Sequence, residues 1–150
     1  MRKALAFLIG SAALLGASPA LAANHRVQML TTSANGSMVF QPAIIRVAPG
    51  DTVTFVPTQP THNAESIPGI MPAGATAFRG RINQPVTVTF DRAGVYGYKC
   101  APHLGMGMVG LVVVGNGGTN LAAARAVSLP GRARQVMGNL LNQAARFASR

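Results

Sequence analysis

Between residues 26 and 114 the chain consists of short apolar stretches separated by turns rich in Gly, Pro and Asn. Residues 51–56 and 86–90 alternate apolar and hydroxylated side chains with a period of two, which is typical of a strand with one face on a core. Residues 27–30, 38–47, 95–99 and 109–114 are further candidate strands. About seven strands of this kind predict a mainly β fold of two packed antiparallel sheets.

The rest of the chain follows other patterns. Residues 61–83 are rich in Pro, Gly and Ala and predict an irregular excursion that caps one sheet. From about residue 119 the pattern predicts two helices, one capped by Thr119 or Asn120 and one that starts near Pro130. The second has one apolar face, which we expect to pack on a sheet: Ala133, Val136, Met137, Leu140, Leu141, Ala144 and Phe147.

Residues 1–22 have the features of an export signal. Arg2 and Lys3 precede an apolar stretch, and Ala20-Leu21-Ala22 is a small-residue cleavage site. Cleavage after Ala22 would leave one domain, residues 23–150. The apolar stretch is too short to span a bilayer comfortably, so we expect no membrane insertion. Export predicts a periplasmic location, where a single cysteine is at risk of oxidation unless a metal protects it.

The charge balance excludes some functions. The chain has thirteen Lys and Arg but only three Asp and Glu, so its formal net charge is +10. The chain has no dense basic block, no Trp and two Tyr, which argues against nucleic acid as the partner and favours an acidic protein. Three carboxylates also argue against catalysis by a carboxylate pair.

Four side chains form the pattern His…Cys-x2-His-x4-Met: His62, Cys100, His103 and Met108. Two imidazoles, a thiolate and a weak thioether are the ligands of copper in blue-copper electron-transfer sites, and the thioether suits copper better than zinc. Cys100 is predicted to end a strand, so the following loop supplies three ligands. Each residue alone could belong to a core, but together they predict one copper ion in an electron carrier.

The segments Thr61-His62-Asn63-Ala64-Glu65-Ser66 and 100–108 resemble the pseudoazurin family of periplasmic cupredoxins, and the likeness extends from about residue 27 to the C-terminus. It implies a Greek-key cupredoxin sandwich of about seven to eight strands with two C-terminal helices. It also implies a type I copper ion on His62, Cys100, His103 and Met108, with Met106 beside the site. The implied partners are a denitrification enzyme such as copper nitrite reductase and a cytochrome-type donor.

Neighbours of these ligands are candidates for tuning and docking. Asn63 could bridge the two ligand segments, or it could be a simple turn residue. Pro102 has no backbone N–H to donate towards the sulfur, which leaves the thiolate electron-rich. The resemblance assigns electron exit to the edge of His103, with an apolar surface around it. Met38 and Met106 could belong to that surface or fill the core; Lys99, Arg79 and Arg81 are candidates for a basic rim.

Three further readings stay open. After cleavage at Ala22, Ala23-Asn24-His25 would offer an amine, two amides and an imidazole to square-planar Cu(II) or Ni(II). The alternative is that His25 simply opens the first strand. A copper delivery protein would share the four ligands. A thiol hydrolase built on Cys100 and His103 needs a group to orient the base, and neither Asp91 nor Glu65 is evidently placed for that.

Overall fold

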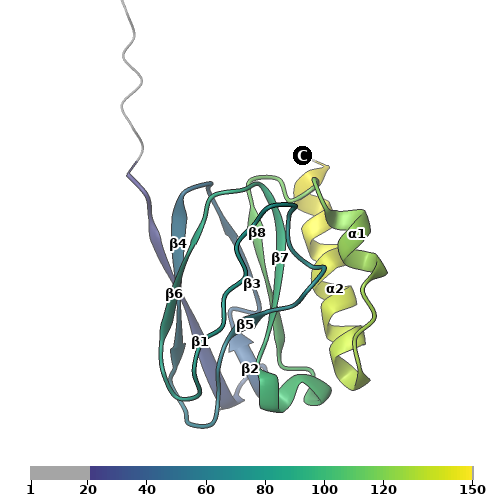
Figure 1. Cartoon of the computed structure of the whole chain (residues 1–150). Coiled ribbons are helices and arrows are strands. Elements are labelled where there is room, and N and C mark those ends of the chain that lie inside the picture. Colours follow the sequence, from purple (N-terminus) through teal and green to yellow (C-terminus); the bar gives the residue numbers. More distant parts are fainter. Residues whose placement is uncertain (1–20, 150) are drawn as a thin grey trace, which may run out of the picture.

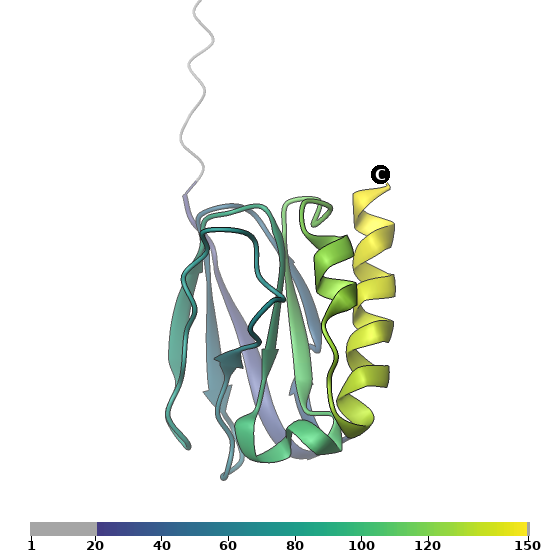
Figure 2. The same ribbon diagram turned by 45° about the vertical axis from the view of Figure 1, so that its right-hand side comes forward.

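The computed structural model describes residues 21–149, so residues 1–20 of the expected export signal lie outside the described part. Two four-stranded sheets face each other, in the orders β2-β1-β4-β6 and β3-β8-β7-β5, and two helices cover the second sheet (Figures 1 and 2). The strands are β1 (Asn24–Ser33), β2 (Gly36–Gln41), β3 (Ile44–Val47), β4 (Asp51–Pro57), β5 (Glu65–Ser66), β6 (Val86–Phe90), β7 (Gly94–Lys99) and β8 (Val109–Val114). The helices are a 3₁₀ segment η1 (Ala101–Met106), α1 (Leu121–Ala126) and α2 (Gly131–Ala148).

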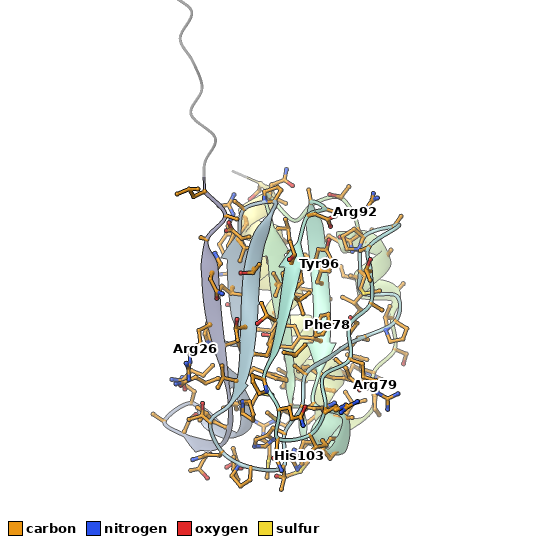
Figure 3. All side chains as sticks on the ribbon, turned by 60° about the vertical axis from the view of Figure 1, so that its left-hand side comes forward. Arg26, Phe78, Arg79, Arg92, Tyr96 and His103 are labelled. Atoms are coloured by element: carbon orange, nitrogen blue, oxygen red, sulfur yellow. The ribbon has the colours of Figure 1, made fainter. Side chains whose placement is uncertain are left out.

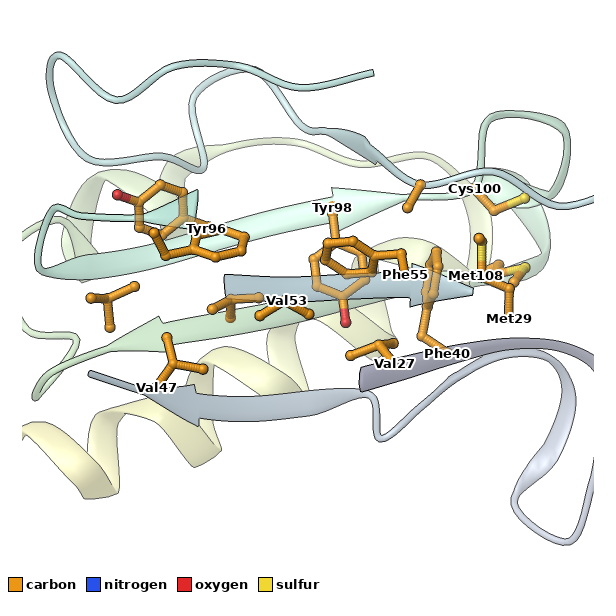
Figure 4. Close-up of a cluster of buried hydrophobic side chains, with 14 residues drawn as sticks. Val27, Met29, Phe40, Val47, Val53, Phe55, Tyr96, Tyr98, Cys100 and Met108 are labelled. Atoms are coloured by element: carbon orange, nitrogen blue, oxygen red, sulfur yellow. The ribbon is translucent and has the colours of Figure 1, made fainter. Parts of the chain in front are cut away.

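The core between the sheets follows from the alternation within the strands. In β4, Val53 and Phe55 are buried, while Thr52 and Thr54, which alternate with them, are partly exposed. The ring of Tyr98 lies 4.7 Å from the rings of both Phe40 and Phe55, in edge-on contacts at the centre of the core (Figure 4). Strand β8 is buried at every residue, because one face meets this core and the other meets the helices.

The expectation of two antiparallel sheets is only partly correct, because each sheet also contains one parallel pair of strands. β1 runs parallel to β4, and β3 runs parallel to β8. These neighbours are not consecutive in the chain, which crosses between the sheets and so brings strands together in the same direction.

The expected single strand at residues 38–47 is wrong. It divides at Pro42, which has no N–H for a ladder, into β2 of one sheet and β3 of the other. The expected irregular excursion is interrupted by the two-residue strand β5, which pairs with β7.

Both predicted helices are confirmed. The apolar face of α2 is buried at Ala133, Met137, Leu140, Leu141 and Ala144, with Val136 and Phe147 partly buried against the same cluster. The side chain of Asn120 does not cap α1. It bonds the backbone of Val95 instead, accepting from N at 2.8 Å and donating to O at 2.9 Å. No helix among residues 21–149 is long and apolar enough to cross a membrane.

The start of α2 packs against the loop that joins β7 to β8. Gly131 has a φ of 53°, and a Cβ there would lie 2.7 Å from the carbonyl oxygen of Gly105. A side chain at this position would therefore collide with η1. This close approach holds the β7–β8 loop, which carries Cys100, His103 and Met108, against the helical layer.

Candidate metal centre

The four predicted ligands come from two segments that meet at one end of the sandwich. His62 follows β4, whereas the other three lie between the end of β7 and the start of β8. The loop of three closes on itself, because the Cys100 N–H donates to the Met108 carbonyl at 3.0 Å and the Met108 N–H donates to the His103 carbonyl at 3.2 Å. His103 lies at the lower end of the molecule in Figure 3, the end at which η1 is found in Figure 1.

Three ligand atoms form a small triangle. The two Nδ1 atoms of His62 and His103 are 3.1 Å apart, and the Cys100 Sγ lies 3.7 Å from the first and 3.4 Å from the second. The centre of such a triangle is about 2 Å from each corner, close to the usual length of a metal–nitrogen bond and slightly short of a metal–sulfur bond. The three side chains therefore fit a single ion between them.

Burial distinguishes the two candidate methionines. Met108 is fully buried in the same core cluster as Cys100, and Figure 4 shows both at one end of that cluster. Met106 is 52% exposed. The thioether that completes the set thus belongs to Met108, and the four side chains form a typical type I copper site.

Thr31 orients the first imidazole. Its Oγ1 lies 2.9 Å from the Nε2 of His62, so the other ring nitrogen is left to face Cys100 and His103. Burial, with the nearby His103 as a second cause, lowers the pKa of His62 and so favours the neutral ring that a metal needs. Sequence reasoning missed Thr31, because nothing in a threonine of the first strand points to a histidine 31 residues later.

The surroundings of Cys100 shift the pKa of its thiol in opposite directions. Burial raises its pKa, the backbone N–H groups of Asn63 and His103 lower it, and the negative charge of Glu65 raises it again. The net result is a pKa above the usual value. A bound cation would supply the missing positive charge, because coordination deprotonates a thiol.

Asn63 joins the two ligand segments. Its Oδ1 accepts from the Ala101 N–H at 2.8 Å, and its Nδ2 donates to the carbonyl of Gly80 at 3.1 Å and to Glu65 Oε2 at 3.3 Å. The residue is only 4% exposed. Asn63, which follows His62, thus holds the backbone of Ala101, which follows Cys100. Pro102 is exposed at the start of η1.

The predicted surface residues gather at the same end. His103 is half-buried. Met38 and Met106 line a cavity of about 260 Å³ that Val109 and Val136 also line. Lys99 Nζ lies 3.5 Å from Glu65 Oε1, and Arg79 Nε lies 3.2 Å from Glu65 Oε2. Arg81 is exposed and lines a neighbouring hollow with Arg79 and Ala101. Sequence reasoning missed this use of Glu65.

The predicted N-terminal metal site lies at the opposite end, where its donors face a carboxylate. The N–H of Ala23 donates to Asp51 Oδ1 at 2.8 Å, and His25 Nε2 lies 2.9 Å from Oδ2. The Ala48 N–H donates to the same oxygen at 3.0 Å. These bonds, that of His25 foremost, lower the pKa of Asp51 to about 2. The nitrogen of Ala23 and the ring of His25, two donors of the predicted chelate, thus already contact Asp51, and the chelate stays a prediction.

The geometry also bears on the hydrolase reading. Within residues 21–149 the only carboxylate bonded to a histidine is Asp51, and its partner is His25. The Nδ1 of His103 faces Cys100 and His62 instead. A Cys–His pair without an orienting carboxylate or amide lacks the third group that such hydrolases normally use.

Known proteins are similar to this chain in sequence and in structure. The sequence model of the family described as "Copper binding proteins, plastocyanin/azurin family" matches residues 27–115. The pseudoazurin of Paracoccus pantotrophus is 48% identical over 134 residues, which cover 89% of this chain and 92% of that protein. The pseudoazurin of Methylorubrum extorquens is 50% identical over 109 residues, 73% of this chain and 74% of that protein.

Solved structures agree with the sequences. A Sinorhizobium pseudoazurin superposes with a TM-score of 0.78 at 43% identity, covering 81% of this chain and 95% of that one. The pseudoazurin of Methylobacterium extorquens AM1 gives a TM-score of 0.76 at 44% identity, covering 80% and 98%. The mainly β fold with two terminal helices, predicted from the sequence, is therefore confirmed.

Proposed function

Because this chain belongs to the plastocyanin/azurin family of copper-binding proteins and, within it, to the pseudoazurins, we propose that it passes single electrons to a periplasmic enzyme of denitrification. Pseudoazurins are electron carriers and not enzymes. The observation that carries the proposal is the convergence of two Nδ1 atoms and one Sγ on a single point. We assign the roles of copper ligands to His62, Cys100, His103 and Met108.

A copper ion at this point supplies one-electron chemistry between Cu(II) and Cu(I). The task of the chain is to keep the ligands still, because ligand movement adds to the barrier for electron transfer. Thr31 fixes the ring of His62, and Asn63 fixes the loop that begins at Ala101. The packing of Gly131 on Gly105 limits the same loop from the helical side.

We assign electron exit to the half-buried ring of His103, the ligand with the largest solvent contact. Lys99, Arg79 and Arg81 form a basic rim near that ring, and opposite charge on a partner would speed its approach. The partners that suit this rim are an acidic acceptor such as copper nitrite reductase and a cytochrome-type donor. Association with either should slow steeply as salt is added.

Export fits the N-terminal geometry. Cleavage after Ala22 would turn the nitrogen of Ala23 into a charged amine. That nitrogen lies 2.8 Å from Asp51 Oδ1, so an amide hydrogen bond would become an ion pair. The remaining residues, 23–150, would form the single domain of the exported protein.

The visible and electron paramagnetic resonance spectra of the copper-loaded protein test the proposal. We expect an intense thiolate-to-copper band that bleaches on reduction and returns on oxidation. Cys100→Ser should abolish the band, whereas Met106→Leu should keep it, because Met106 is largely exposed. A colourless copper form of the wild type would contradict electron transfer and favour copper delivery. Thiol-dependent turnover without metal would favour a hydrolase.

A further inference from the structure

Glu65 is the one acidic side chain at the copper end, among the three Asp and Glu of the chain. Asp51 pairs with Phe90 across β4 and β6, so Asp51 and Asp91 both lie at the other end, where Figure 3 labels Arg92. The copper end therefore contains a single negative side chain among several positive ones. Lys99, Arg79 and Asn63 all contact this carboxylate.

Strand pairing places two members of the basic rim beside Glu65. β5 runs antiparallel to β7 with Glu65 opposite Lys99, and a separate bridge pairs Glu65 with Arg79 on its other side. Directly opposed residues of antiparallel strands project from the same face. The carboxylate thus lies between two cations, and one oxygen faces each of them at 3.5 Å and 3.2 Å.

The same carboxylate reaches the ligand loop through one further residue. Glu65 Oε2 accepts from Asn63 Nδ2 at 3.3 Å, and Asn63 Oδ1 accepts from the N–H of Ala101, the residue after Cys100. Asn63 itself follows His62. Lys99 and Arg79 are therefore connected to both ligand segments by a continuous set of contacts.

The exposure of the three charged groups differs sharply. The side chain of Glu65 is 13% exposed and that of Lys99 24%, but that of Arg79 is 85% exposed. An ion pair with so exposed a partner contributes little to folding stability. Arg79 is instead open to an incoming anion, in competition with the carboxylate behind it.

We propose that Glu65 is a positioning residue for docking: it holds Lys99 and Arg79 beside the ligand loop and sets the positive charge that a redox partner meets there. This inference rests on the proposed electron-transfer function. Glu65 keeps Lys99 and Arg79 in position, and its negative charge neutralises one of their two positive charges. The rim thereby attracts acidic partners less strongly than its cations alone would, and releases them more readily.

Two small oxidants of opposite charge test this role. Reduced copper-loaded protein gives one electron to hexacyanoferrate(III), an anion, or to tris(phenanthroline)cobalt(III), a cation, and the rate is followed by stopped flow. Glu65→Gln keeps the shape of the side chain and removes its charge. We expect the anion to react about fivefold faster with this variant at about 0.01 M ionic strength, and the cation to react more slowly by a similar factor.

Two variants serve as controls. Asp91→Asn removes the same charge at the far end, and we expect it to change either rate by less than about twofold, because distance and salt weaken its effect. Glu65→Asp keeps the charge and should restore rates near those of the wild type. Above about 1 M salt all four proteins should converge.

Opposite shifts with the two oxidants support the proposal, since a disturbed copper site would move both rates in one direction. Equal effects of Glu65→Gln and Asp91→Asn would overturn it, as would no effect of either. Failure of the wild type to react with both oxidants would instead overturn the electron-transfer function itself, and this inference with it.

Discussion

The two ends of the sandwich use histidine in opposite ways. At the end where the chain enters, His25 faces the carboxylate of Asp51. At the other end, His62 and His103 face each other and a buried thiol. Burial beside a second imidazole lowers the pKa of His62 and favours its neutral ring, whereas the ring of His25 is already hydrogen-bonded to a carboxylate. The neighbours, rather than the residue type, decide which histidines are ready to bind a metal.

The largest effect expected from this difference concerns copper itself. His62→Ala should lower copper affinity more than about 100-fold, since even neighbours of a ligand commonly matter by ten- to a hundredfold. His25→Ala should leave the affinity and the visible band of the first copper equivalent unchanged. Competition titrations against a chelator measure both. Similar losses in the two variants would erase the distinction between the ends.

A smaller effect is expected in the reduction potential. Pro102→Ala introduces an N–H within the ligand loop, between Cys100 and His103, and donation to the thiolate would favour Cu(I). One added hydrogen bond of about 1 kcal/mol corresponds to a rise of roughly 40 mV. Pro49→Ala, in the exposed turn before Asp51, is the matched control and should leave the potential unchanged. Voltammetry of the three proteins decides, and a lower potential for Pro102→Ala would count against the account of the thiolate.

An effect on folding stability is expected only at low pH, and it concerns Asp51. Its pKa is lowered from 3.8 to about 2, chiefly by the hydrogen bond with His25. A lowered carboxyl pKa in the folded state stabilises the protein above the unfolded value, and this stabilisation is lost as the pH falls through the folded value. The stability advantage of the wild type over Asp51→Asn should therefore shrink between pH 3.8 and about 2. Urea denaturation across this range measures it; a constant difference would mean that Asp51 acts without its charge.

Local patterns predicted much of the fold and the metal centre. Alternation gives β4 and β6 nearly residue for residue, and the Cys-x2-His-x4-Met spacing places three ligands on one loop. Strand neighbours were harder to predict, because β1 and β4 meet in parallel only after the chain has crossed between sheets. For that reason the hydrogen bond between Thr31, on a distant strand, and His62 could not be predicted from the sequence.

The same limit applies to charge. Glu65 follows His62 by three residues, yet its proposed role depends on strand β7 and on a separate bridge to Arg79, both from elsewhere in the chain. The split of residues 38–47 into two sheets has a local cause, Pro42, but no local pattern indicates which sheet each half joins.

The central claim is that the fold holds the metal ligands in place before and during electron transfer. Crystal structures of the metal-free, Cu(II) and Cu(I) proteins test it most directly. We expect the Nδ1 atoms of His62 and His103 and the Sγ of Cys100 to keep their mutual distances within about 0.5 Å in all three states. A metal-free structure in which His103 turns away from Cys100, or in which η1 rearranges, would contradict the claim.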